Sequence, residues 1–297
     1  MALGIQAAPQ TVLVIGATGM LGSAVAKAFG QVGHHVRLLA RNVEAARAQF
    51  PAFEVAAGDV RDAGSVDQAM EGCDSVFVSL KAPSLAEAQA VEVAGTGGVA
   101  EAAARQGARI MYLSGAGLGE HHRSIPFAAV KLDAEARIRA SGAEFTIFRP
   151  THFMESLWAF VRGGRADVIG RQPHRYHYLA ADDFGHMVAA SATLDKAAGR
   201  SFEIFGPQAF TMTEALGVYR DIVRPDLKVG MVPLPILRTV AFVSRNRQLA
   251  HVADLFAAFV QIGEAGDPAP ANRLLGAPAT TLDSWCRTQA LAQKVPT

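Results

Sequence analysis

Three glycines follow the first apolar run of the sequence, Thr11–Ile15, and open a stretch with helical periodicity. Gly16 permits a tight turn, Gly19 lets the backbone approach a pyrophosphate, and Gly22 allows a helix to pack closely on a strand. The N-terminus of that helix would offer unpaired N–H groups and a positive dipole end to phosphates. Glycines in this strand–turn–helix context predict a dinucleotide-binding loop, although a turn that only packs well is the alternative. The residues that we expect to contact the nucleotide here are Gly16, Thr18, Gly19, Met20 and Gly22.

The second apolar run, His35–Ala40, indicates which dinucleotide the loop would bind. A site for NAD usually has an acidic residue at the end of this strand, where it binds the ribose 2′-hydroxyl. Here no carboxylate occurs before Glu44, and Arg41 stands directly after the run. A guanidinium at this place could pair bidentately with a 2′-phosphate, so the sequence favours NADP(H). The alternative is that Arg41 is a solvated loop residue.

One helical stretch carries a lysine at the spacing that short-chain reductases use, but it lacks their tyrosine. Those enzymes place the two residues at YxxxK, so that both side chains lie on one helix face. The tyrosine delivers a proton, and the lysine lowers its pKa. This sequence reads FAAVK, with Phe127 at the tyrosine position and Lys131 at the lysine position. Because phenylalanine has no hydroxyl, the full Ser–Tyr–Lys triad is absent.

Two segments resemble the NmrA-like group of atypical short-chain dehydrogenases/reductases. The first is GATGMLGSAV, which begins at Gly16, and the second is KLDAEARIRASGAEFTIFRPTHFMES, which begins at Lys131. The second is similar to that group's lysine helix, SG turn, strand and RPT motif. The group includes NADP-dependent quinone reductases, isoflavone-reductase-like enzymes and redox-sensing regulators, and its tyrosine is often replaced. The resemblance covers roughly residues 11–210.

The resemblance implies further contacts with the nucleotide. Asp59, after the third apolar run, would contact the adenine through its side chain or through adjacent backbone at Val60. The backbone at Leu80 and Lys81 would line the nicotinamide ribose, and the Lys81 side chain could touch phosphate or solvent. Lys131 would contact that ribose or stand near the hydride acceptor. A lysine on a solvated helix face is the alternative for Lys131.

Candidates for catalysis lie at the end of the fifth apolar run and after it. Ser114 stands where ligands bind in parallel sheets, and it could hydrogen-bond a substrate carbonyl or only cap the loop. His121 and His122 follow in a loop expected over the nicotinamide. Either could replace the missing tyrosine as proton donor, because imidazole titrates near neutral pH, although exposed loop histidines are common. We expect Tyr112 to be packed in the strand.

Apolar residues after Pro150 could form the substrate side of the site. Phe153, Met154 and Trp158 offer surface suited to a flat or aromatic substrate, and the alternative is that they form core between two lobes. A polar and aromatic cluster follows at residues 174–177, and we expect Asp182 or Asp183 to cap the next helix. The sequence has no paired histidines with metal spacing and no G-x-S-x-G elbow, so we expect no metal.

Short apolar runs alternate with longer helical stretches through the first half of the chain, which is typical of a parallel sheet. We predict an α/β fold, a Rossmann-type doubly wound parallel sheet with a smaller C-terminal lobe. Residues 1–150 would be the dinucleotide-binding core, and residues 151–297 the remaining sheet elements and a substrate-side lobe, in one structural unit. The expected strands are Thr11–Ile15, His35–Ala40, Phe53–Gly58, Asp74–Leu80, Ala108–Gly115 and Glu144–Pro150.

The composition narrows the class of protein and its partners. With 28 Lys plus Arg against 27 Asp plus Glu, the chain has no charge pattern for contacting nucleic acid or a membrane surface. The first ten residues lack the pattern of a signal peptide, and the stretch Met231–Val243 is too short to span a bilayer. Cys73 and Cys286 lack metal-ligand spacing, so we interpret them as reduced thiols of a cytoplasmic protein.

These patterns favour reduction of a small quinone- or carbonyl-type acceptor by NADPH. The acceptor would take its proton from water or a histidine, since the tyrosine is missing. A non-catalytic NADP(H)-binding redox sensor is the alternative, and an epimerase of sugar nucleotides is weakened by the same absence. A homodimer is possible, because the small-residue face of the helical stretch Val91–Ala104 could pack on a partner or on the sheet.

Overall fold

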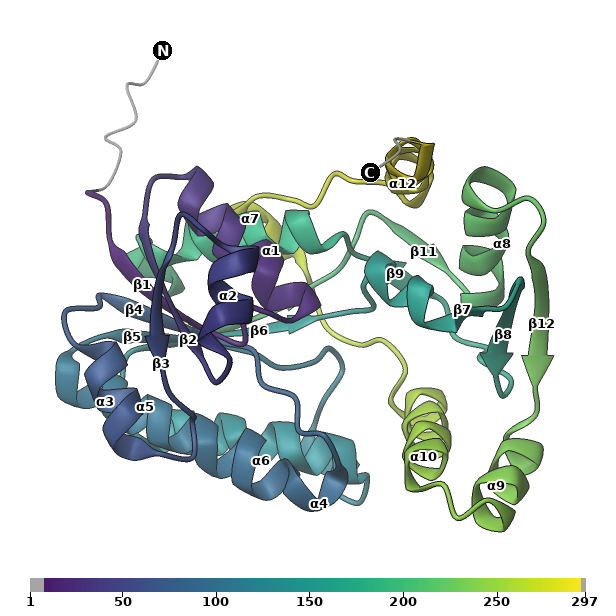
Figure 1. Cartoon of the computed structure of the whole chain (residues 1–297), viewed down its shortest axis with the longest axis horizontal. Coiled ribbons are helices and arrows are strands. Elements are labelled where there is room, and N and C mark those ends of the chain that lie inside the picture. Colours follow the sequence, from purple (N-terminus) through teal and green to yellow (C-terminus); the bar gives the residue numbers. More distant parts are fainter. Residues whose placement is uncertain (1–7, 295–297) are drawn as a thin grey trace.

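A seven-stranded parallel sheet forms the centre of the computed structural model, which describes residues 8–294 (Figure 1). The strand order reverses between β1 and β4, and ligands bind at such a switch point in open α/β sheets. The predicted fold class and its six strands are confirmed to within two residues at each end. In spatial order the strands are β10 (Arg200–Ile204), β6 (Phe145–Pro150), β5 (Arg109–Leu113), β4 (Ser75–Val78), β1 (Thr11–Ile15), β2 (His35–Ala40) and β3 (Glu54–Ala57).

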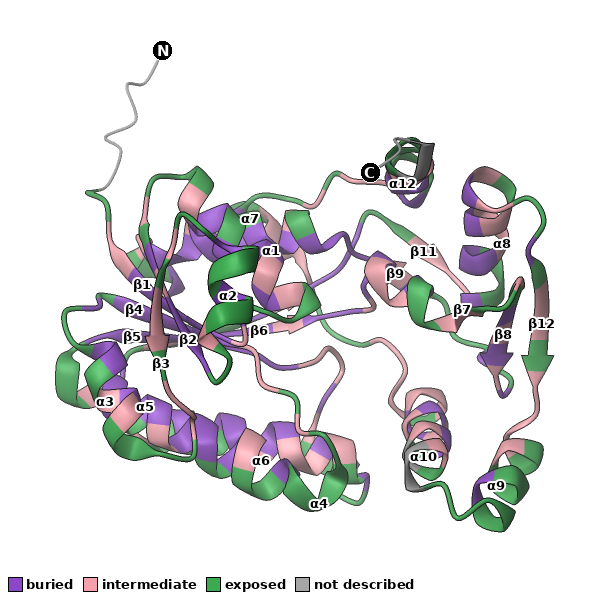
Figure 2. Ribbon diagram, viewed as in Figure 1, coloured by how far each residue is buried: buried purple, intermediate pink, exposed green. Residues whose placement is uncertain are grey.

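Helices cover both faces of this sheet because successive residues of each strand point to opposite sides. In β1, Val12 and Val14 pack on one face with α1 (Met20–Gln31), α7 (Ala181–Ala192) and α11 (Ala269–Leu275). Leu13 and Ile15 pack on the other face. There they meet α3 (Ala63–Met70), α5 (Gly95–Gln106) and α6 (Pro126–Ala140). Figure 2 shows the buried sheet between two helical layers whose outer faces are exposed.

The seventh strand comes from the second half of the chain. This strand, β10, pairs in parallel with β6, from Arg200 opposite Thr146 to Ile204 opposite Pro150, and it was not among the six strands expected from the sequence. The helix α7 lies against α1 and completes one helical layer. The Arg109 guanidinium fixes its C-terminal end by donating to the carbonyls of Ser191 and Leu194, both at 3.0 Å.

The long helical stretch expected from Ser84 to Gln106 is interrupted. It begins as α4 (Leu85–Ala88), continues as a π-helical segment η1 (Gln89–Ala94) and ends as α5. The small residues of α5, among them Gly95, Gly97 and Ala103, are buried. They pack within the chain, against the sheet and α6, so this face is not free for a partner subunit.

A smaller lobe follows β6 at the carboxyl ends of the strands (Figure 1). The 3₁₀ segment η3 (Met154–Phe160) leads into it, and its core includes Leu157, Tyr178 and Leu216. Its strands are β7 (Val161–Arg162), β8 (Arg165–Ile169) and β12 (Lys228–Val232) in one sheet, and β9 (Tyr176–Tyr178) paired with β11 (Gln208–Phe210). Its helices are α8 (Met212–Val223), α9 (Leu234–Val243), α10 (Arg247–Ile262) and α12 (Leu282–Lys294).

Three further predictions concern membrane-spanning helices, the N-terminal segment and the cysteines. Within residues 8–294, no helix is both long and apolar enough to cross a membrane. The prediction made for the N-terminal segment falls mostly on residues 1–7, which lie outside the described residues. Cys73 and Cys286 are free and buried, as expected.

Candidate functional site

The glycine loop between β1 and α1 leaves no room for side chains. Gly16 has φ +88°, and a Cβ built on it would lie 2.1 Å from the carbonyl oxygen of Ser79, at the end of β4. A Cβ on Gly22 would lie 2.1 Å from the carbonyl oxygen of Gly16. The Gly19 N–H donates to that same carbonyl at 3.0 Å. The loop is therefore a tight backbone structure at the switch point of the sheet.

The start of α1 fits a phosphate group. Gly19 is the N-cap, no side chain caps the helix among the described residues, and its first turn contains no acid. Thr18, Gly19 and Met20 are exposed around it. The N–H groups of a first helical turn have no intrahelical acceptors, so they can bind an anion. The N-terminus of α1 is therefore uncapped and surrounded by exposed residues. Both features are expected of a site for the pyrophosphate of a dinucleotide.

The side of the loop expected to bind adenosine carries an unpaired cation. Arg41 lies exposed at the end of β2 and forms no ion pair with any residue that the structure describes. Asp59 is held by Arg61, with guanidinium–carboxylate distances of 2.6 and 3.0 Å, and this pairing lowers the pKa of Asp59 to about 2. Val60 is partly buried against the core. Asp62 caps α3 by accepting from the Gly64 N–H at 3.2 Å.

Lys131 is buried in an ion pair. Its Nζ lies 3.0 Å from Glu92 Oε2, with side chains 10 and 12 % exposed, and 5.6 Å from the ring centre of Tyr112. Burial opposes the charge, but Tyr112 and Glu92 outweigh it and raise the pKa of Lys131. Tyr112 is buried, as expected, and burial raises its pKa. The ion pair therefore keeps Lys131 charged and buried. Lys131 is not among the described residues that line the cavity presented below.

Glu92 also connects Lys131 to the loop after β4. Its Oε1 accepts from the Ala82 N–H at 2.9 Å. In this loop Leu80 packs partly buried on the core, whereas Lys81 is exposed and lines the cavity. The predicted nicotinamide-ribose loop and the predicted lysine are thus joined through one carboxylate. The role of Glu92 was not predicted from the sequence, because a glutamate on a helix ordinarily faces solvent.

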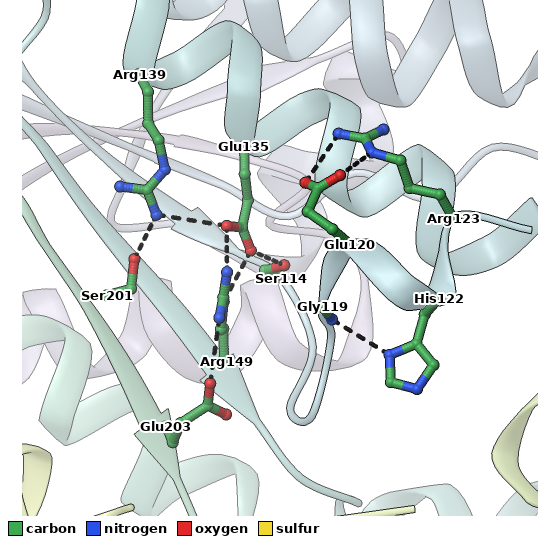
Figure 3. Close-up of polar contacts among 10 residues, drawn as sticks. All are labelled: Ser114, Gly119, Glu120, His122, Arg123, Glu135, Arg139, Arg149, Ser201 and Glu203. Atoms are coloured by element: carbon green, nitrogen blue, oxygen red, sulfur yellow. Dashed lines mark hydrogen bonds and ion pairs between the residues drawn. The ribbon is translucent and has the colours of Figure 1, made fainter. Parts of the chain in front are cut away.

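Ser114 belongs to a buried chain of charged groups (Figure 3). Its hydroxyl donates to Glu135 Oε1 at 2.6 Å, and Arg149 donates twice to Glu135, at 2.6 and 3.0 Å. Glu203 lies 3.4 Å from the other end of the same guanidinium. Since its one proton points to Glu135, the hydroxyl offers only acceptor lone pairs to a ligand. In this arrangement Ser114 cannot donate to a substrate carbonyl as expected from the sequence.

The two loop histidines lie on a short 3₁₀ turn, η2 (Glu120–His122). His121 is exposed and His122 is buried, with ring centres 3.8 Å apart. The Gly119 N–H donates to His122 Nδ1 at 3.3 Å, and the ring points away from Ser114 in Figure 3. Burial, then His121, lowers the pKa of His122. Neither ring is among the described residues that line the cavity, although the sequence predicted both over the nicotinamide.

A cavity of about 790 Å³ lies between the carboxyl edge of the sheet and the smaller lobe. Leu21 of α1, Lys81 and Ser114 line its sheet side, and Phe256 and Phe259 of α10 line the opposite side. Phe127, at the position of the missing tyrosine, also lines it and packs edge-to-face on Phe259, with ring centres 6.3 Å apart. The position that carries the hydroxyl in a complete triad is therefore an apolar part of the wall.

His152 is a cavity residue that the sequence analysis named only as part of the stretch after Pro150. Its ring packs on Tyr176 at 4.1 Å and on Phe259 at 4.9 Å between centres. Its Nε2 is buried without a hydrogen-bond partner in the described part of the chain. Burial lowers the pKa of His152 to about 4, so the imidazole is neutral at neutral pH. Its position directly after the RP end of β6 was the available signal.

The structure separates the three predicted substrate residues. Phe153 lines the cavity. Met154 is buried in the core of the smaller lobe and Trp158 is 44 % exposed, packed on Trp285 at 5.7 Å between ring centres. Neither of these two residues is among the described lining residues of the cavity. The alternative of interlobe packing therefore describes Met154 better than the predicted substrate contact.

The polar and aromatic cluster at residues 174–177 divides in the same way. Tyr176 lines the cavity, and its hydroxyl donates to the Phe259 carbonyl at 2.7 Å. His177 Nδ1 lies 2.5 Å from Glu264 Oε2, and Thr151 donates to Glu264 Oε1. Glu264, which follows α10, therefore connects this part of the chain to Thr151 after β6 and to His177 of β9.

The prediction that Asp182 or Asp183 caps α7 is wrong. The helix begins after Ala180, and Glu155 accepts from the first N–H, that of Ala181, with both oxygens at 3.1 Å. Asp183 instead accepts from the backbone and hydroxyl of Thr280 at 2.8 and 2.9 Å. A carboxylate distant in sequence occupies the cap, which local spacing cannot reveal.

Within residues 8–294, no group of three or more His, Cys, Asp or Glu side chains could hold a metal ion.

The fold and the glycine loop together define a Rossmann-type protein of the short-chain dehydrogenase/reductase class. The model of the NmrA-like family matches residues 8–290. The chain therefore belongs to the NmrA-like family, an atypical branch of that class with an NAD(P)-binding Rossmann fold.

Similar proteins of established structure share the whole fold. The triphenylmethane reductase of Citrobacter sp., complexed with NADP(H), has a TM-score of 0.74 at 19 % identity over 94 % of this chain and 99 % of that chain. An NADPH-dependent quinone oxidoreductase of Escherichia coli, complexed with NADPH, has a TM-score of 0.73 at 20 % identity over 93 and 99 %. Among curated relatives, the (4-alkanoyl-5-oxo-2,5-dihydrofuran-3-yl)methyl phosphate reductase of Streptomyces griseus is 26 % identical over 95 % of this chain and 98 % of its own length.

Proposed function

We propose that the protein is an NADPH-dependent oxidoreductase that reduces a quinone- or carbonyl-type acceptor in the cavity beside Ser114. The observation that carries this proposal is the position of the cavity. Its wall includes Leu21, which directly follows the glycine loop, and Lys81, which follows β4. A nucleotide in the glycine loop and an acceptor in the cavity would therefore occupy adjoining spaces at the carboxyl edge of the sheet.

Arg41 supports NADPH over NADH as the reductant. It is exposed, unpaired among the described residues and placed where the 2′-phosphate is expected. No acid stands at the end of β2 to bind a free 2′-hydroxyl. Two of the solved relatives above contain NADP(H) or NADPH, and an azoreductase of Xenophilus azovorans, 23 % identical over 68 % of this chain and 70 % of its own length, uses NAD(P)H by name.

The residues of the chain would position the acceptor more than activate it. Bound NADPH would supply the hydride. Phe127, Phe153 and Phe259 would exclude water and stack a flat acceptor, and Ser114 would accept a hydrogen bond from its hydroxyl after reduction. Lys131, through Glu92, would hold the loop at Ala82 against the nicotinamide ribose.

The proton that accompanies the hydride would come from solvent. Burial lowers the pKa of His152 to about 4, so at neutral pH its ring is a neutral imidazole, whose remaining N–H is too weak an acid to protonate the acceptor. His121 and His122 stand away from the cavity wall. A quinone reduced to its hydroquinone anion is basic enough to take a proton from water, so the missing tyrosine is compatible with such an acceptor.

We further expect a cytoplasmic protein, and a homodimer remains a prediction for size-exclusion measurements.

The test begins with fluorescence titrations of the purified protein with NADPH and NADH. Consumption of NADPH is then followed by absorbance with quinones, azo compounds and unsaturated lactones. We expect tighter binding of NADPH and turnover of at least one acceptor class. Tight binding without turnover of any of them would overturn the proposal. It would favour a redox sensor, the candidate that Phe127 on the cavity wall supports.

A further inference from the structure

The charges in the cavity do not balance. Among the described residues, four charged ones line it: Lys81, Arg162, Arg165 and Asp167. Arg165 pairs with Asp167, at 2.9 and 3.2 Å, so these two charges compensate each other. Lys81 and Arg162 form no ion pair with any other described residue. Lys81 is already expected beside the nucleotide, and Arg162 is the cation left without a role.

Arg162 is an exposed residue of the cavity wall, and the local structure places a second arginine opposite it. It ends β7, directly opposite Arg165 in the antiparallel pairing of β7 with β8. The two residues between them, Gly163 and Gly164, have φ +55° and +77°. Two positive φ angles are typical of the tight hairpin turns that fix strand register, so the two guanidinium groups cannot slide apart. Like charges directly opposite on paired strands destabilise a sheet, and only Arg165 has a compensating carboxylate. An anion beside Arg162 would remove this conflict.

The rest of the cavity suits an apolar chain. Besides Ser114 at the sheet edge and Arg162 in the smaller lobe, the lining includes Leu249, Val252 and Phe256 of α10. The volume of about 790 Å³ lies in the upper part of the range of roughly 300–1,000 Å³ typical of pockets for whole drug-sized ligands. A bare single-ring quinone would leave most of this space unfilled.

We propose that the acceptor is an amphiphilic anion whose phosphate or carboxylate headgroup pairs with Arg162. Its apolar chain lies along α10, and its reducible group lies at the Ser114 end. Arg162 is then a specificity-determining residue, because a guanidinium binds either headgroup bidentately. This inference rests on the proposed reductase function for the reducible group, but the headgroup site can be tested without turnover.

The binding test uses the full chain saturated with NADPH, so that added anions cannot occupy the nucleotide site. Octyl phosphate, octanoate, octanol and inorganic phosphate are titrated by calorimetry. We expect octyl phosphate or octanoate to bind about tenfold more tightly than octanol, the effect of one charge-assisted interaction, and inorganic phosphate to bind more weakly than either. The two anions distinguish a phosphate from a carboxylate headgroup.

Substitution of Arg162 separates charge from packing. Arg162→Gln should remove the tenfold advantage of the anions and leave octanol binding unchanged. Arg171→Gln is the matched control, because Arg171 is exposed, forms no ion pair among the described residues and lies outside the cavity lining. Equal binding of octyl phosphate, octanoate and octanol by the unaltered protein would overturn the inference. An Arg171→Gln effect as large as that of Arg162→Gln would also overturn it.

A kinetic experiment separates this inference from the proposed function. Two quinones with the same alkyl chain, one ending in a carboxylate and one in a hydroxyl, are compared as acceptors. Arg162→Gln should raise KM about tenfold for the carboxylate alone, with kcat unchanged. Turnover of both quinones without any headgroup preference would overturn this inference and leave the reductase proposal standing. No turnover, with the preference in binding intact, would overturn the reductase proposal alone.

Discussion

The two sides of the cavity are built in different ways. On the nucleotide side the backbone itself sets the shape: Gly16 and Gly22 are packed so closely that no side chain fits. On the opposite side, α9 and α10 form the wall with side chains, and α9 leaves Phe242 and Val243 85 and 75 % exposed. A site defined by backbone tolerates little change, whereas a wall made of side chains can change with the ligand. The difference indicates that substitutions are tolerated less in the glycine loop than on the wall formed by α9 and α10.

The largest effect is expected at Gly16. Gly16→Ala adds a Cβ that meets the Ser79 carbonyl at 2.1 Å, so we expect a loss of more than about 4 kcal/mol in the free energy of unfolding, or no folded protein. Gly33 is the control, since it has the same φ of +88° but no described atom within 4 Å of its Cβ. Gly33→Ala should cost only about 1 kcal/mol, the strain of the left-handed backbone. Urea unfolding measures both, and equal losses would contradict the backbone-defined loop.

The next effect concerns Lys131, whose charge is buried on the nucleotide side. Lys131→Met leaves Glu92 buried without its partner, which should cost about 3 kcal/mol in the free energy of unfolding. The double variant Lys131→Met/Glu92→Leu should recover part of this loss because no charge is then left unpaired. Urea unfolding of the original protein, both single variants and the double variant tests this, and losses that simply add would show that the two residues act independently.

A smaller effect, in pH dependence, is expected on the acceptor side. The pKa of His152 falls from 6.5 to about 4 on folding, so below pH 6.5 the unfolded chain binds a proton that the folded protein does not. Stability should therefore decrease by about 2 kcal/mol between about pH 7 and pH 5 through this group. His152→Phe should lose correspondingly less in urea unfolding over that range. Parallel losses in both proteins would remove His152 as the cause.

The smallest effect is expected at Arg41, the exposed residue after β2 that we propose binds the 2′-phosphate. Arg41→Gln should weaken NADPH binding about tenfold, because one charge-assisted contact to the 2′-phosphate is lost. NADH binding should not change, so the ratio of the two dissociation constants is the measurement. Arg171→Gln again serves as the control for general charge. An equal change for both nucleotides would place Arg41 outside the 2′-phosphate site.

The sequence predicted what depends on local chemistry. The ends of β1 and β2 match to the residue, because a short apolar run and the turn that follows it are local signals. Phe127, which the sequence placed at the tyrosine position, lines the cavity.

Long-range pairing was not predictable in the same way. The roles of Glu92, Glu135 and Glu155 each depend on a partner distant in sequence, at separations of 39, 14 and 26 residues. Each carboxylate sits on a helical or 3₁₀ segment where the sequence pattern indicates solvent exposure. The pairing of β10 was not predicted, because its parallel neighbour β6 ends 50 residues earlier. The segment η3 and several strands of the smaller lobe lie between them in sequence. Such pairings become visible only when the whole sheet is assembled.

The late position of α7 and β10 has a consequence for synthesis on the ribosome. The face of β1 that carries Val12 and Val14 stays uncovered by α7 until residue 192 has been made, and the edge strand is complete only at Ile204. Arg109 likewise waits for the carbonyls of Ser191 and Leu194. The nucleotide-binding half therefore cannot close as the chain emerges in order, and more than half of the protein must leave the exit tunnel with an apolar sheet face open to chaperones.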